Sequence, residues 1–173
     1  MKKISIAVGV LLSAVAASSH ASVFTLSGTM DVLQAGTNGS FGTGTGSGTG
    51  TISGSYDDAT NLLDYSISFS DLTSAVTNLH FHDGAVGVSG GVSLSIPGPY
   101  LSSPVTASGV SVSASGETNL LAGNWYVNVH TASFGGGEIR GQVNVTPVPE
   151  PAAFAAISGA LMLGFVVVRR RQS

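Results

Sequence analysis

Short runs of alternating apolar and polar residues constrain the fold of this chain more than any other feature of its sequence. Four such runs are Leu63–Ser70, Val92–Ile96, Trp125–Thr131 and Glu138–Val145. Successive side chains of a β-strand point to opposite faces, so each run places its apolar residues on one face of a strand. Residues 22–148 are rich in glycine, serine, threonine and valine, a composition that disfavours helices. The sequence therefore predicts an all-β fold, an antiparallel β-sandwich of seven or eight short strands.

Two local irregularities are also expected. The runs Val105–Ala107 and Val110–Ala114 are out of phase across Ser108 and Gly109, which predicts a β-bulge at that point. A single helical turn is expected at Thr118–Ala122, stopped by the glycine that follows it.

A glycine-rich tract, Gly36–Gly54, has glycine at every second position from Gly42 to Gly50. The tract lacks the Gly-Lys-Ser/Thr ending of a phosphate-binding P-loop, and no βαβ unit follows it, so a nucleotide site is not expected. The favoured interpretation is a flexible strand or hairpin arm whose register is weakly specified. Repeat or linker character remains an alternative.

The C-terminal segment carries three elements in a fixed order. They are Pro149, Glu150 and Pro151, then the uncharged run 152–168, then Arg169, Arg170 and Arg171. As a helix the 17-residue run would be about 26 Å long, at ~1.5 Å per residue, the short end of what spans a bilayer. The arginines would stay on the cytoplasmic side. This pattern predicts a C-terminal transmembrane helix.

The same order of elements resembles a PEP-CTERM sorting signal of exported bacterial proteins. In that family an exosortase, a membrane cysteine transpeptidase, recognises the tail. The resemblance implies cleavage near the Pro-Glu-Pro motif, a transient membrane anchor, and delivery of the rest of the chain to the cell surface or extracellular matrix. An ordinary single-span tail anchor is the alternative.

The N-terminus supports export. Lys2 and Lys3 precede the apolar run Ile4–Ala17, and a Ser-His-Ala sequence ending at residue 21 fits the small-x-small pattern of a signal peptidase site. We therefore expect a signal peptide at residues 1–21 and a mature chain that begins at Ser22. A retained N-terminal anchor is the alternative. The chain has no cysteine, so the exported domain folds without disulfides.

Removal of both ends would leave one domain, residues 22–148, and would change its charge. Five of the six basic residues lie in the ends, so this domain has eight acids and Arg140 as its one base, a net charge of −7 against −3 for the whole chain. A single base cannot neutralise a row of phosphates, which excludes nucleic acid as a partner. Cationic partners, or a divalent cation that bridges to an anionic polymer, fit this charge.

Three histidines remain in the domain: His80, His82 and His130. The first two are separated by one residue of a strand and so share a face, and His130 is on the same side of its own run as Tyr126 and Asn128. Three imidazoles suit an open zinc or copper site, with the last position left to solvent or substrate.

Two acids could support these histidines. Asp83 and Glu138 are close to them in sequence, and either could add an oxygen ligand or orient an imidazole. Histidines that hydrogen-bond backbone or carboxylates without any metal are the alternative.

Arg140 is the second candidate for a functional residue. Glu138 and Arg140 are two residues apart in a predicted strand, which favours a surface ion pair worth about 0–1 kcal/mol. A bidentate contact between Arg140 and an anion or a partner's carboxylate is the alternative.

Several motifs together carry a family resemblance. They are Phe24–Gly28, His80–Ala85, Leu121–Thr131 and Gly137–Gln142. These segments resemble a CHRD domain, the module named for chordin, over nearly all of Phe24–Val143. The resemblance implies a β-sandwich in an exported setting, and it brings no catalytic residues.

The His-x-His-Asp-Gly sequence at residues 80–84 also resembles Cu/Zn superoxide dismutase, another β-sandwich. That enzyme's two-metal site uses more histidines than the three present here, so a dismutase of that type is not expected. The sandwich is expected to be immunoglobulin-like or superoxide-dismutase-like.

The expected function is that of an exported, exosortase-sorted bacterial surface or matrix protein whose CHRD domain is a non-enzymatic binding or structural module. No cofactor is required. Expected partners are signal peptidase, exosortase, and exopolysaccharide or other surface proteins. The alternative is a zinc or copper domain with redox or hydrolytic activity centred on the three histidines.

Overall fold

The computed structural model describes residues 22–36 and 46–149. The strands are β1 (Val23–Asp31), β2 (Thr49–Asp57), β3 (Leu62–Ser70), β4 (Val76–Asp83), β5 (Val92–Ile96), β6 (Val105–Ser111), β7 (Trp125–Thr131), β8 (Ile139–Gln142) and β9 (Asn144–Pro147), and the helices are α1 (Val32–Gly36) and α2 (Ala114–Leu121). The predicted signal peptide, most of the sorting signal with its helix at 152–168, and part of the glycine-rich tract lie outside the described residues. No helix of the described part is both long and apolar enough to cross a bilayer.

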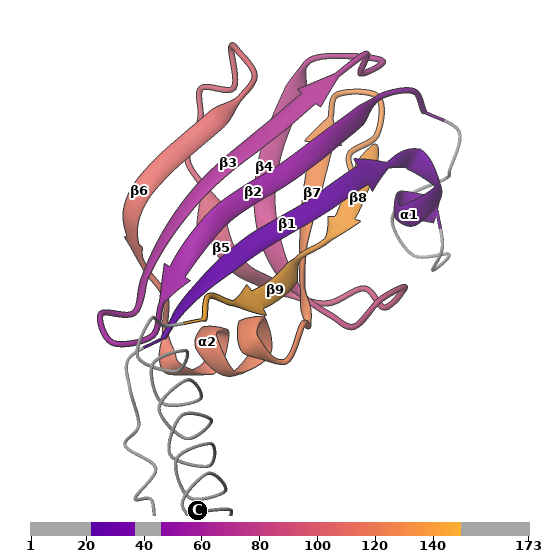
Figure 1. Ribbon diagram of the computed structural model, residues 1–173. Helices are drawn as coiled ribbons and strands as arrows, with labels where there is room; N and C mark the ends of the chain where they lie inside the picture. The colour runs from indigo at the N-terminus through magenta and orange to yellow at the C-terminus, as the bar shows by residue number, and fades with distance from the viewer. Residues whose placement is uncertain (1–21, 37–45, 150–173) are drawn as a thin grey trace, which may run out of the picture.

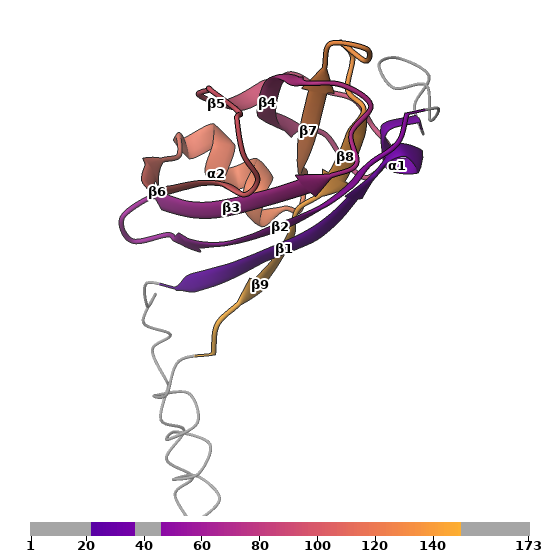
Figure 2. The same cartoon turned by 90° about the horizontal axis from the view of Figure 1, so that it is seen from above.

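The strands form one antiparallel sheet that curls over itself. Their order is β5-β4-β7-β8-β1-β2-β3-β6, and β9 also pairs with β1. Figure 2 shows two facing layers, with β5, β4, β7 and β8 in one and β9, β1, β2, β3 and β6 in the other. The prediction of an all-β antiparallel fold is confirmed, and its two layers belong to one continuous sheet.

The chain passes from one layer to the other at Val143. On one side of it Gln142 pairs with Tyr126 of β7, and on the other side Asn144 pairs with Ser27 of β1. The side chain of Val143 is fully buried at this point. A strand that changes partners in this way makes the corner of a sandwich, so β8 and β9 hold the two layers together.

Apolar side chains from both layers fill the space between them. The largest fully buried ones are Trp125, Tyr56, Phe81, Leu26, Met30, Leu63, Ile67, Leu79, Ile96, Leu120 and Ile139. Phe81 of β4 meets Tyr65 of β3 edge to face, with ring centroids 5.4 Å apart, so aromatic contacts link the layers directly. Helix α2 closes one end of the core with Leu120 (Figure 1).

The β-bulge predicted between the two halves of β6 is present. Leu63 and Tyr65 are two residues apart on β3, but their partners on β6, Val110 and Ala107, are three residues apart. The segment Ser108–Gly109 therefore holds one residue more than the facing part of β3. Gly109 has φ +67° and donates its N–H to Oδ1 of Asp64 at 2.7 Å. The left-handed backbone and this hydrogen bond together fix the bulge.

Helix α2 starts four residues earlier than the predicted turn. Ser113 caps it by accepting a hydrogen bond from the N–H of Gly116 at 3.2 Å, so the helix begins at Ala114. It ends at Leu121, one residue before the predicted end, and Gly123 with φ +73° follows the capping residue and stops the helix as predicted. A second short helix, α1, was not expected. Its N-terminus is capped by Asp31, whose Oδ1 accepts from the N–H of Gln34 at 2.8 Å.

The described part of the glycine-rich tract includes the start of β2, a strand inside the sheet. Thr49–Asp57 pairs along its whole length with β1 on one side and β3 on the other. A side chain on Gly54 would clash with the backbone carbonyl of Asp64 on β3. Glycine at this position therefore allows the close approach of two strands.

The two ends of the domain lie next to each other. The N–H of Val148 donates to the carbonyl of Val23 at 2.8 Å. Both ends leave the sheet at the same side of the molecule (Figure 1).

We expect Gly54→Ala to lower the free energy of unfolding by about 2 kcal/mol, the usual cost of forcing extra volume against fixed backbone. Gly91→Ala is the matched control, because a Cβ there meets nothing within 4 Å. Urea unfolding followed by tryptophan fluorescence measures both. Equal midpoints for the two variants would contradict the packing described for β2.

Candidate metal centre

The outer face of the layer formed by β4, β7 and β8 is polar. Its side chains are His80 and His82 of β4, Tyr126, Asn128 and His130 of β7, and Arg140 and Gln142 of β8. The alternate positions of the same strands point the other way into the core, as Phe81, Val127 and Ile139 do. We call this outer surface the polar face.

Strand pairing brings the three histidines together. His80 pairs with Asn128 and His82 with Tyr126, which places His130 one step along the same face, diagonal to His80. The ring centroids are 5.5 Å apart for His80 and His82, 5.1 Å for His80 and His130, and 5.8 Å for His82 and His130. One nitrogen from each ring lies within 4.8 Å of the others.

Backbone carbonyls fix the orientation of two of these rings. Nδ1 of His82 lies 3.1 Å from the carbonyl oxygen of Gly90, and Nδ1 of His130 lies 2.9 Å from that of Gly135. A carbonyl can only accept, so each Nδ1 carries a proton and each Nε2 is unprotonated. Nε2 of His82 is buried and has no hydrogen-bond partner among the described residues. Metal-binding histidines are commonly oriented in this way by their second nitrogen.

The separation between His80 and His130 also fits a shared metal ion. Nδ1 of His80 is 3.3 Å from Nε2 of His130. Two nitrogens bound to tetrahedral zinc at ~2.0–2.1 Å lie about 3.3–3.4 Å from each other. The same spacing allows a hydrogen bond from His80 to His130 when no metal is bound.

The histidines favour the neutral form that a metal requires. Burial lowers the pKa of His80, His82 and His130 below the ordinary value for histidine. For His82, the hydrogen bond to Gly90 partly offsets burial, and the charges of His130, His80 and Arg140 lower the pKa further. Neutral imidazole is the form that coordinates metal ions.

Glu138 has a different role from the one expected. Its Oε1 accepts from the N–H and the hydroxyl of Thr73, both at 2.7 Å, and its Oε2 accepts from the hydroxyl of Thr131 at 2.7 Å. The side chain is 2% exposed and makes no ion pair with Arg140, so the prediction of a surface ion pair is wrong. Glu138 precedes the first residue of β8, and the rule that alternate residues share a face applies only within a strand.

Neither acid joins the histidine cluster. Within the described ranges, the candidate metal group there consists of the three histidines alone. The expectation that Asp83 or Glu138 adds an oxygen ligand is therefore not met.

Arg140 is buried beside the cluster. The side chain is 5% exposed, and its Nη2 donates to the carbonyls of Ala85 at 3.2 Å and Val88 at 2.9 Å. Its Cζ lies 3.5 Å from the centre of the Tyr126 ring, which in turn stacks on His82 with centroids 5.0 Å apart. Tyr126 thus connects the arginine to the histidines.

The CHRD domain family matches residues 23–143 of the chain. This chain belongs to the CHRD domain family. A search of curated proteins and a search of solved structures each found no match. The matched range contains all three histidines and Arg140, so the polar face is part of the CHRD domain itself.

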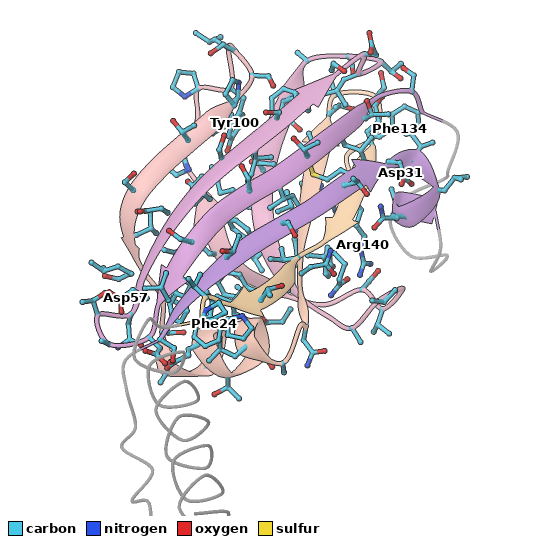
Figure 3. The ribbon with its side chains drawn as sticks, in the orientation of Figure 1. Phe24, Asp31, Asp57, Tyr100, Phe134 and Arg140 are labelled. Atoms are coloured by element: carbon cyan, nitrogen blue, oxygen red, sulfur yellow. The ribbon has the colours of Figure 1, made fainter. Side chains whose placement is uncertain are left out.

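A cavity of about 220 Å³ opens on the polar face of the CHRD domain. Its lining includes His82, Tyr126, Asn128, His130 and Arg140, and it is walled by glycines of the β4–β5 and β7–β8 loops and by Ala35 of α1. Figure 3 shows Arg140 near α1, at the end of the sheet opposite Phe24 and Asp57. The cavity therefore lies away from the two ends of the domain.

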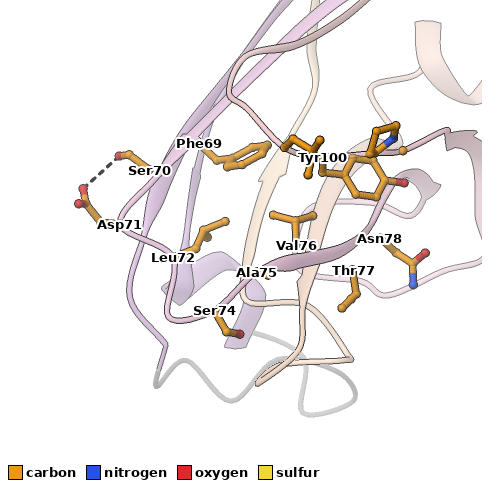
Figure 4. A pocket seen from close by; sticks show the side chains of 13 residues that line it. Phe69, Ser70, Asp71, Leu72, Ser74, Ala75, Val76, Thr77, Asn78 and Tyr100 are labelled. Atoms are coloured by element: carbon orange, nitrogen blue, oxygen red, sulfur yellow. Dashed lines mark hydrogen bonds between the residues drawn. The ribbon is translucent and has the colours of Figure 1, made fainter.

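A larger hollow lies next to the β3–β4 turn (Figure 4). It is an open groove of about 820 Å³ and shares no lining residue with the cavity. Its apolar side chains include Phe69, Leu72, Val76 and Tyr100. Four buried side-chain atoms have no hydrogen-bond partner among the described residues. Two belong to His82 and Asn128, which line the cavity, and two belong to Asp83 and Trp125, which line neither hollow. The cavity, unlike the groove, therefore contains polar groups that a ligand could satisfy.

Sequence reasoning assigned no role to several residues of this site. Tyr126, Asn128 and Gln142 alternate with core residues in their strands, and this pattern was the available signal. The carbonyls of Gly90 and Gly135 carried no signal, because their direction depends on the paths of two loops.

We expect Glu138→Gln to destabilise the domain by about 1–3 kcal/mol near pH 7, the range for loss of hydrogen bonds to a buried charge. Burial raises the pKa of the Glu138 carboxyl, but the bonds from Thr73, Thr131 and Ser47 outweigh it and lower the pKa below 4.5. A lowered pKa stabilises the fold above about pH 4.5 and loses this effect as the pH falls through the folded-state value. Urea unfolding from pH 7 to pH 3 should therefore show the difference between the two proteins shrinking. A difference independent of pH would contradict this role.

Proposed function

We propose that this chain is an exported CHRD-domain protein whose domain is a non-enzymatic binding module for a zinc or copper ion, held by His80, His82 and His130. The observation that carries the proposal is the convergence of three imidazoles around a buried Nε2 that has no partner among the described residues. Three neutral nitrogens suit zinc and copper(II), and copper(II) binds such ligands more tightly. A tetrahedral ion would keep one position open.

Binding without catalysis is supported by the lining of the cavity. None of the residues that line it is a carboxylate, so the described part of the site offers no acidic general base. All three imidazoles are assigned as ligands and are not free to transfer protons. The alternative of redox or hydrolytic activity rests on the open position of the ion alone.

Export and sorting form the second part of the proposal. They rest on the signal peptide expected at residues 1–21 and on the tail at residues 149–173 that resembles a PEP-CTERM signal. The adjacent ends of the domain support this arrangement, because both segments can be attached and cleaved at one side, away from the cavity. Signal peptidase and exosortase would process the chain, which would then contact exopolysaccharide or surface proteins.

We expect protein purified from its producing cells to bind one equivalent of zinc or copper(II). His82→Ala should weaken binding by more than the ~10–100-fold that changes around the ligands usually cause. Asn78→Ala is the matched control, an exposed residue of the same strand and face. Elemental analysis and calorimetric titration measure stoichiometry and affinity. Substoichiometric metal that is the same in the His82 variant would overturn the metal site.

We expect replacement of Pro149, Glu150 and Pro151 by alanine to leave the protein in the membrane fraction, because the sorting enzyme would no longer recognise its tail. Cell fractionation and immunoblotting measure the distribution, and mass spectrometry of the mature protein reports both termini. Release at the level of the unaltered protein would count against sorting.

A further inference from the structure

The metal site leaves one buried charge on the polar face without a counterion. Arg140 is 5% exposed, and among residues 22–36 and 46–149 no carboxylate pairs with it. Its Nη2 donates to two loop carbonyls and lies 3.5 Å from Oε1 of Gln142, whereas no described residue accepts a hydrogen bond from its Nε or Nη1. A buried charge without a counterion is costly even when neutral oxygens accept some of its hydrogen bonds, so a residue kept in this state is expected to meet an anion.

The geometry of Arg140 suits a planar anion. Tyr126 covers one face of the guanidinium group, which leaves the edge with its N–H donors as the part that can reach a ligand. Arg140 lines the same cavity as His82 and His130. The edge of a guanidinium group matches the two oxygens of a carboxylate.

Asn128 adds a second requirement. Its Nδ2 donates to the carbonyl of Gly136 at 3.1 Å, which identifies the other end of the amide as Oδ1. That oxygen is buried and receives no hydrogen bond from the described residues. Asn128 also lines the cavity, and a ligand that reaches this oxygen must donate a hydrogen bond to it, for example from a hydroxyl group beside its carboxylate.

We propose that the cavity binds a small hydroxycarboxylate, of the size and chemistry of a sugar acid. Its carboxylate binds Arg140, a hydroxyl donates to Asn128, and an oxygen takes the open position of the metal ion. This inference rests on the proposed metal site. The cavity volume of about 220 Å³ admits a single sugar acid, and the single guanidinium group matches one negative charge.

Zinc-loaded full-length protein should bind D-glucuronate in calorimetric titration. D-Glucose, which lacks the carboxylate, and acetate, which lacks the hydroxyls, should each bind more weakly. Metal-free protein should also bind D-glucuronate more weakly. Equal binding of glucose and glucuronate, or no binding of glucuronate to zinc-loaded protein, would overturn the inference and leave the metal site intact.

Variants separate the two proposals. Arg140→Gln should keep zinc and lose about 10–100-fold in affinity for glucuronate, the effect of removing a charge-assisted hydrogen bond. Asn128→Asp replaces the amide by a carboxylate of nearly the same shape and should also keep zinc. It should bind glucuronate at least as weakly as Arg140→Gln does, because the new carboxylate repels the ligand and pairs with Arg140. This second variant serves as the test where the arginine variant does not fold.

Asn78→Ala should leave both affinities unchanged. Unchanged glucuronate affinity in Asn128→Asp would overturn the inference. Failure of the unaltered protein to bind zinc would overturn the metal site and this inference with it.

Discussion

The register between β4 and β7 is the constraint on which both the core and the polar face depend. One pairing sets Phe81 opposite Val127 inside the domain, and the next sets His82 opposite Tyr126 outside it. A slip of one residue would turn the imidazoles into the core and Phe81 toward solvent. Burial of Phe81 and its neighbours therefore selects the same register that gathers the histidines, and the loop carbonyls of Gly90 and Gly135 then orient two of the rings.

Glu138 and Arg140 are two buried charged residues near β8 with different hydrogen-bond partners. The difference distinguishes a structural residue from a candidate ligand-binding residue. Glu138 accepts hydrogen bonds on both oxygens from neutral groups such as Thr73 and Thr131, which satisfies the carboxylate within the domain. Arg140 is held by loop carbonyls through Nη2 alone and keeps donors at the edge of a cavity. The Glu138 carboxylate connects segments of the fold by hydrogen bonds, and Arg140 has donors that a ligand could use.

The sequence predicts what depends on neighbouring residues and misses what depends on distant ones. The alternation in Leu63–Ser70 and the change of phase at Ser108 and Gly109 are local, and both reappear in β3 and β6. The shared face of His80 and His82 is local as well. The approach of His130 depends on pairing across about fifty residues, and the separation of Glu138 from Arg140 depends on where β8 begins.

Charge explains how an acidic domain can hold an anion. Residues 22–148 carry a net charge of −7, which repels anionic polymers at long range. The charge of an exposed acid is screened beyond about 8–10 Å at physiological salt, and none of the described residues that line the cavity is acidic. Inside it, a divalent ion on neutral imidazoles and one guanidinium group would both act at short range in a poorly solvated space, where Coulomb attraction is stronger than in water. Such a site favours a small anion that can enter the cavity over a polyanion that must lie along the surface.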